Sequence, residues 1–226
     1  MRGAKAQRGV LSRVIDSSSN KSWKRRLFSY RSYTPIPFLA IMIVFAAPTI
    51  LSLVIGFVAA LIGEWIRFWG VSYAGSETRT TGTVGGTQLV TSGPYSYVRN
   101  PLYIGNILMY IGVGIMSNAL MPYLPLIAFV YFAYQYTVIV SLEEVYLSQT
   151  FSNWNEYTKS VRRFIPSLTK FGGKNIFPQA EGSVRGDPSD KPNFSRALRS
   201  ERSSLIALSS ITILLCVFYL EHWRIA

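Results

Sequence analysis

The chain has 226 residues, of which 49% are hydrophobic, and a formal net charge of +12. The length leaves room for one membrane domain with short tails but not for two folded domains. A single histidine (His222) and a single cysteine (Cys216) exclude an intrachain disulfide and a metal site built from these residue types. The apolar residues stand in long blocks and the basic residues in polar segments, which is typical of membrane proteins.

Residues 1–34 form a predicted basic cytoplasmic tail, with Asp16 as the single acid. We expect this charge to bind anionic lipid head groups, at roughly 1 kcal/mol per residue near the surface, rather than nucleic acid. Membrane proteins are alternative binding partners of this basic tail. Its Arg- and Ser-rich composition resembles an organellar transit peptide as well, so an organellar membrane is an alternative location. The basic residues are Arg2, Lys5, Arg8, Arg13, Lys21, Lys24, Arg25, Arg26 and Arg31.

The first apolar block, residues 36–70, is too long for one span of ~20 residues and short for two. Pro48 divides it, because proline removes a helical hydrogen bond and disfavours helix at the preceding residue. We therefore predict a tight hairpin of a short helix over 35–47 and a longer helix over 50–73.

Residues 74–92 are polar and rich in glycine, which predicts a loop without a dinucleotide-binding motif. Two further membrane helices are expected over 101–118 and 122–147. In the polar segment that follows, residues 152–161 are expected to be helical, and the apolar run 205–220 is long enough to span. The prediction is an all-α integral membrane protein with five transmembrane helices, divided into a tail (1–34), a membrane core (35–170), a polar linker (171–202) and a C-terminal helix (203–222).

Nearly all Lys and Arg residues lie in alternate connecting segments, so charge predicts the orientation of the chain. The segments 1–34, 74–100 and 148–202 carry them, whereas the turns near Pro48 and Pro122 carry none. Basic residues favour the cytoplasmic side, which places the N-terminus in the cytoplasm.

Ionisable residues inside a bilayer are costly and are therefore functional candidates. Glu64 and Arg67 are spaced to pair on one helix face, and a structural ion pair is the favoured interpretation. Arg99 precedes Pro101, which suits a first helical turn. The free N–H groups of that turn and Arg99 together favour an anion, although a snorkelling interfacial arginine is an equal alternative.

Glu143 and Glu144 end the fourth expected helix, where two acids oppose the helix dipole. A cation should compensate them: Arg99, Arg162 or Arg163, or the sulfonium or ammonium of a ligand. Repulsion between the two carboxylates also favours one of them as a general base.

The stretch GPYSYVRNPLYIGN, followed by SLEEVYLSQTFSNWNEYTKSVRRFIP, resembles the isoprenylcysteine carboxyl methyltransferase and phospholipid N-methyltransferase superfamily. The pattern GPY-x-x-V-R-H-P-x-Y-x-G, a later acid pair and a closing R-x-I-P are all matched, except that Asn100 stands where the family has histidine. The matching positions are Gly93, Pro94, Tyr95, Val98, Arg99, Pro101, Tyr103, Gly105, Glu143, Glu144, Phe151, Tyr157, Arg163, Ile165 and Pro166.

This resemblance implies methyl transfer from S-adenosyl-L-methionine to a lipid-soluble carboxylate or amine at the cytoplasmic face of the membrane. The expected catalytic residues are Glu143, Glu144 and Arg163, and no metal is implied. A non-catalytic membrane subunit that keeps the fold is the alternative, and a nicotinamide-dependent membrane reductase is a third. The implied cofactor-binding residues are Tyr95, Arg99, Asn100, Pro101, Tyr103, Gly105 and Glu144.

Overall fold

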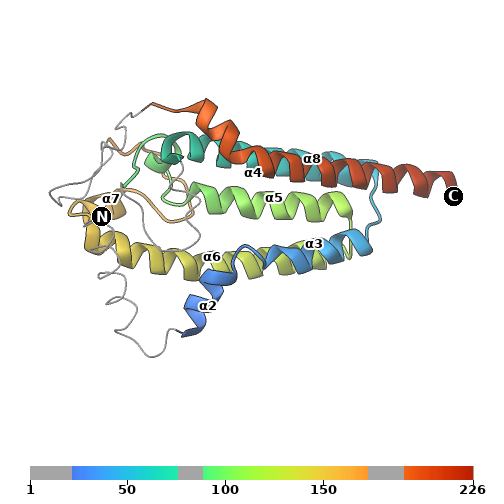
Figure 1. Cartoon of the computed structure of the whole chain (residues 1–226), viewed down its shortest axis with the longest axis horizontal. Helices are drawn as coiled ribbons and strands as arrows, with labels where there is room; N and C mark the ends of the chain where they lie inside the picture. Colours follow the sequence, from blue (N-terminus) through green and yellow to red (C-terminus); the bar gives the residue numbers. More distant parts are fainter. Residues whose placement is uncertain (1–21, 76–88, 173–190, 226) are drawn as a thin grey trace.

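The computed structural model describes residues 22–75, 89–172 and 191–225, and these residues form an all-helical bundle without a named strand. Long helices run side by side, and the start of α5, the end of α6 and α7 lie at one end of the bundle (Figure 1). The helices are α2 (Ser22–Tyr30), α3 (Pro35–Val44), α4 (Ile50–Ala74), α5 (Pro101–Ser117), α6 (Tyr123–Thr150), α7 (Trp154–Ser160) and α8 (Phe194–Ile225), with a 3-10 turn, η2 (Gly93–Ser96).

The helix boundaries follow from local chemistry. Thr49 begins α4 through a capping box, in which Thr49 Oγ1 accepts from the Ser52 N–H at 3.1 Å and Ser52 Oγ accepts from the Thr49 N–H at 2.9 Å. Pro101 occupies the first turn of α5, and Asn118 ends that helix in the left-handed conformation with φ 52°. The predicted boundaries near these residues are confirmed to within a few residues.

The C-terminal helix α8 begins at Phe194 instead of near residue 205. Asn193 caps it, because the Arg196 N–H donates to Asn193 Oδ1 at 2.9 Å. The part of the predicted linker from Phe194 onward is therefore helical, although its sequence is polar. The predicted helix within 152–161 is confirmed as α7.

Three helices are long and apolar enough to cross a membrane: α4, α6 and residues 194–221 of α8. α3 and α5 have 10 and 17 residues, so the count of five spans is not confirmed. The tight hairpin is not confirmed either, because α3 packs chiefly on α5 and α6, whereas α4 packs on α5 and α8.

The α4–α5 contact is the closest in the bundle and depends on glycine. A Cβ added to Gly56 would lie 2.4 Å from the Gly112 carbonyl oxygen, and one added to Gly63 would lie 2.6 Å from the Gly105 carbonyl oxygen. Glycine at these positions lets the two backbones touch, as in many membrane helix pairs. The contact fixes α5, which begins within the GPYSYVRNPLYIGN stretch, against α4.

Candidate functional site

The segment before α5 is held in place by main-chain hydrogen bonds to the segment after α7. The Arg99 N–H donates to the Arg162 carbonyl at 2.9 Å, and the Asn100 N–H donates to the Arg163 carbonyl at 3.2 Å. Val98 and Arg162 form an isolated parallel bridge. This pairing brings together two stretches that are about sixty residues apart in the sequence.

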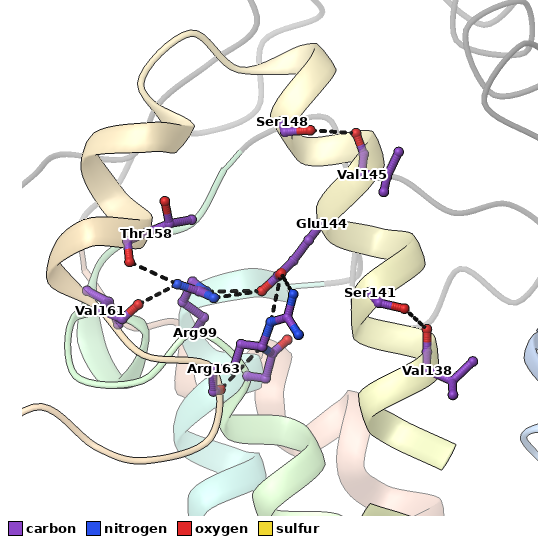
Figure 2. A network of polar contacts seen from close by, with 10 residues as sticks. Arg99, Val138, Ser141, Glu144, Val145, Ser148, Thr158, Val161 and Arg163 are labelled. Carbon is purple, nitrogen blue, oxygen red and sulfur yellow. Dashed lines mark hydrogen bonds and ion pairs between the residues drawn. The ribbon is translucent and has the colours of Figure 1, made fainter. Parts of the chain in front are cut away.

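Arg99 points from this segment into a polar cluster with Glu144 and Arg163, which we name the two-arginine cluster (Figure 2). Arg99 donates to Glu144 Oε1 from Nε at 3.1 Å and from Nη2 at 2.9 Å. Arg163 donates to Glu144 Oε2 from Nε at 2.8 Å and from Nη2 at 2.5 Å. Each carboxylate oxygen of Glu144 thus has its own guanidinium, in the forked geometry that strengthens such pairs.

Arg99 also ties the cluster to the end of α7. Its Nη1 donates to the carbonyl oxygens of Thr158 at 3.1 Å and Val161 at 2.6 Å (Figure 2). A cation suits the C-terminal end of a helix, where carbonyl groups lack intrahelical partners. Only 11% of the Arg99 side chain is exposed, against 43% for Arg163, so Arg99 is the fixed arm of the cluster and Arg163 the accessible one.

The neighbouring acid, Glu143, faces α5. Tyr103 donates its hydroxyl to Glu143 Oε1 at 2.8 Å, and the positive charge of Arg31 acts electrostatically on both groups. Glu143 and Glu144 therefore have different surroundings, although they are adjacent in the chain. One is neutralised by two guanidinium groups, and the other is hydrogen-bonded by a phenol.

Two tyrosines, Tyr95 and Tyr157, support the loop that carries Arg99. Tyr157 donates its hydroxyl to the Tyr95 carbonyl at 2.7 Å. Burial, with a smaller contribution from Glu143, raises the pKa of the Tyr95 hydroxyl. Burial likewise raises the pKa of the Tyr157 hydroxyl, with Tyr95 adding to the effect. Both groups therefore stay neutral at physiological pH, and Tyr157 remains a donor.

The structure brings most of the predicted site residues to one end of α5 and α6, with different roles. Asn100 donates from Nδ2 to the Arg163 carbonyl at 3.2 Å, and Pro101 is buried in the first turn of α5. Gly105 packs against α4, where an added Cβ would lie 2.6 Å from Arg67 Cγ. Arg162, one of the three candidate partners of the acid pair, contributes its backbone while its side chain is exposed.

The predicted position of the acid pair at the end of its helix is wrong. α6 continues to Thr150, so Glu143 and Glu144 lie well before its last turn. The dipole acts mainly within that turn and contributes little at their position. The compensating cations are nevertheless present, because Glu144 is bound by Arg99 and Arg163.

The predicted pairing of Glu64 with Arg67 is confirmed, and Arg67 has a further partner that its sequence neighbourhood does not indicate. Arg67 Nε lies 3.6 Å from Glu64 Oε2, and Arg67 Nη2 lies 2.6 Å from Glu201 Oε2 on α8. Glu201 stands among Arg199 and Arg202, so its sequence context is that of a surface acid. Among the described residues, no group of three or more His, Cys, Asp and Glu side chains could hold a metal ion.

Comparison with known proteins matches residues 51–153 to the model of the phospholipid methyltransferase family. The cobalt-zinc-cadmium resistance protein CzcN of Cupriavidus metallidurans is 30% identical over 149 residues, covering 66% of this chain and 63% of that protein. The nickel-cobalt-cadmium resistance protein NccN of Alcaligenes xylosoxydans xylosoxydans is 28% identical over 142 residues, covering 63% and 62%. The chain thus spans less than two thirds of the length of either relative, and no solved structure matches it significantly.

The matched segment contains Arg99, Tyr103 and the acid pair, and it ends before Arg163. It also contains α6 and all of α4 except Ile50, and these are two of the three helices that are long enough to cross a membrane. The resemblance expected from the sequence is thereby confirmed, because residues 51–153 match the model of the phospholipid methyltransferase family.

Proposed function

We propose that this protein transfers a methyl group from S-adenosyl-L-methionine to a lipid-soluble acceptor, a carboxylate or an amine, at the cytoplasmic face of the membrane. The observation that carries the proposal is the placement of the two-arginine cluster beside the Tyr103–Glu143 pair. Two guanidinium groups and two carboxylates then lie together at one end of α5 and α6.

These residues fit the charges of the cofactor. S-adenosyl-L-methionine has a carboxylate, an ammonium group and a positively charged sulfur. Arg163, the exposed arm of the cluster, would receive the carboxylate, with Arg99 beside it. Glu143 and Glu144 would hold the cationic groups, and Tyr95, Asn100 and Pro101 would shape the adjoining loop. Gly105 would contribute indirectly, because it allows α5 to pack closely against α4.

When bound, S-adenosyl-L-methionine supplies an electrophilic methyl group whose transfer to an acceptor nitrogen or oxygen leaves a neutral thioether. The protein's part is to align the acceptor and to exclude water. An amine acceptor loses a proton in the reaction, and Glu143 would take it, whereas a carboxylate acceptor needs no base. The acceptor would enter sideways from the bilayer between the membrane helices.

The orientation of the chain belongs to this proposal. Lys and Arg residues gather in the segments that flank the two-arginine cluster, and basic segments favour the cytoplasmic side. The N-terminal tail and the site would then share the cytoplasmic face, where the soluble cofactor is present. Insertion of a glycosylation or protease tag at either terminus tests this orientation.

Binding of S-adenosyl-L-methionine to the purified chain in detergent micelles tests the proposal directly. We expect wild-type protein to bind the cofactor and Glu144→Gln to lose most of the affinity, because Gln can neither hold a cationic group of the cofactor nor fix the two arginines in place. Incubating membranes with methyl-labelled cofactor then identifies the labelled lipid. Absence of binding to the folded wild-type protein overturns the proposal.

A non-catalytic membrane subunit that keeps the fold is the second candidate. Two observations favour it: the matched relatives are named metal-resistance proteins, and Asn100 uses its amide to hold a backbone carbonyl. An asparagine also cannot titrate near neutral pH, as a histidine could. Co-purification with stoichiometric partners, without methyl transfer to any extracted lipid, would support this candidate instead.

A further inference from the structure

A second polar cluster lies deeper among α4, α5 and α8, and we name it the two-glutamate cluster: Arg67, Glu64 and Glu201, with Asn106 and Ser204 bound to it. Arg67 forms an ion pair with Glu201 at 2.6 Å, and Ser204 donates to Glu64 Oε2 at 2.9 Å. The Glu201 side chain is 1% exposed and that of Glu64 is 5% exposed. Charges buried this deeply in a membrane helix bundle are costly and call for a functional explanation.

The cluster reaches α5 through Asn106, which accepts a hydrogen bond from Arg67 Nη1 at its Oδ1. The Asn106 amide also lies next to the hydroxyl of Tyr136 on α6, and the Tyr136 hydroxyl lies next to that of Tyr110. Arginine can only donate, so it occupies the amide oxygen of Asn106 and leaves the amide N–H for Tyr136. The Tyr136 hydroxyl hydrogen is then available to Tyr110. Arg67 thus sets the direction of a chain that crosses from α4 to α6.

This chain ends beside the candidate site. The ring of Tyr136 packs on that of Tyr103 with a centroid distance of 4.6 Å and an interplanar angle of 31°. Tyr103 is the residue that donates to Glu143. The position of the Tyr103 hydroxyl therefore depends on a neighbouring ring whose own hydroxyl is held by Asn106 and, through it, by Arg67 and α8.

From this continuity we infer that Arg67, Asn106 and Tyr136 are positioning residues, which hold Tyr103 against Glu143 and couple the C-terminal helix to the site. The inference rests on the proposed function, because its main readout is cofactor binding. It extends beyond the family-matched segment, since Glu201 lies on α8. If these residues only hold the helices together, their substitution should lower the stability of the protein without changing cofactor affinity in the folded state.

The test is a double-mutant cycle between Asn106→Leu and Tyr103→Phe, measured as affinity for S-adenosyl-L-methionine in detergent micelles below the melting temperature of every variant. We expect each change alone to weaken binding by about threefold or more. In the Asn106→Leu background, Tyr103→Phe should have little further effect, because Tyr103 is no longer held in place. Effects that multiply would overturn the inference, because groups without a shared network act independently.

Two matched pairs of variants separate positioning from packing. Tyr136→Phe removes the hydroxyl held by Asn106 and should weaken binding, whereas Tyr110→Phe removes the far end of the same chain and should not. Ser204→Ala removes the α8 contact of Glu64 without touching Asn106 and should also leave affinity unchanged. Equal affinity of Tyr136→Phe and wild type would contradict the inference.

Failure of the proposed function can be told apart from failure of this inference. If folded wild-type protein binds no S-adenosyl-L-methionine, the proposed function fails. The same cycle is then measured as the unfolding midpoint in detergent. Coupling between Asn106→Leu and Tyr103→Phe in that quantity supports the network, and additive shifts overturn it.

Discussion

The two-arginine cluster and the two-glutamate cluster use the same residue types in opposite proportions. In the first, two guanidinium groups share one carboxylate near the bundle end, and 43% of Arg163 is exposed. In the second, two carboxylates share one guanidinium deep between helices, and Glu201 is almost fully buried. The difference in exposure is why we assign cofactor binding to the first cluster, where Arg163 is accessible, and helix alignment to the second, where both carboxylates are buried.

Arg99→Ala should cause the largest loss of cofactor affinity, and it tests the binding role of the two-arginine cluster. It leaves Glu144 with one partner and the end of α7 without its cation. Loss of one member of a largely buried pair costs about 3 kcal/mol, or about 100-fold in affinity for S-adenosyl-L-methionine. Isothermal titration calorimetry in detergent micelles measures it. Arg162→Ala is the control, since that side chain is exposed, and it should bind as wild type.

Glu201→Gln tests the role of the two-glutamate cluster in holding the helices together. The change keeps the size of the side chain but leaves the Arg67 charge with one acid in a buried place. We expect the free energy of unfolding to fall by about 2–3 kcal/mol, measured by denaturant titration in micelles. Glu221→Gln, an exposed acid on the same helix, should leave it unchanged. A loss of stability as large for Glu221→Gln would show that the buried pair has no special role.

Arg163→Ala should weaken cofactor binding by about tenfold, which is less than Arg99→Ala, because Arg163 is the exposed arm and solvent screens its pairing. Raising the salt concentration should reduce the difference between this variant and wild type. Titrations at low and high salt measure both effects. Losses of equal size for the two arginines would remove the distinction between a fixed and an accessible arm.

Asn100→Ala should have the smallest effect. It removes the amide donor to the Arg163 carbonyl at 3.2 Å but keeps the backbone N–H that bonds to the same oxygen. One exposed hydrogen bond is worth about 1 kcal/mol, or about fivefold in affinity. Binding titrations check this value. Complete loss of binding would mean that the amide meets the cofactor directly.

Much of the helix layout could be predicted because its signals are local. Pro48, Pro101 and Asn118 mark helix ends through backbone chemistry that acts within a few residues. The start of α8 could not be predicted in this way. Its first turns are polar, and tertiary contact with α4 outweighs that composition.

The residue types of the candidate site could also be predicted, but not their pairing. The acid pair called for a cation, and three arginines were available. The choice of Arg99 and Arg163 over Arg162 depends on main-chain pairing between segments that lie far apart in the chain. Glu201 was missed for the same reason, because its partner Arg67 lies on a helix more than a hundred residues earlier. Long-range contacts of this kind leave no periodic signal in a single sequence.

The parallel bridge between Val98 and Arg162 has a consequence for how this site can evolve. Because backbone atoms set the register, the side chain at position 100 can change while Arg163 still arrives at Glu144. Either histidine or asparagine at position 100 is therefore compatible with the backbone geometry. Proline at that position would remove the N–H on which the register depends. The side chain at position 100 can thus change without any change in the backbone pairing that brings Arg163 to Glu144.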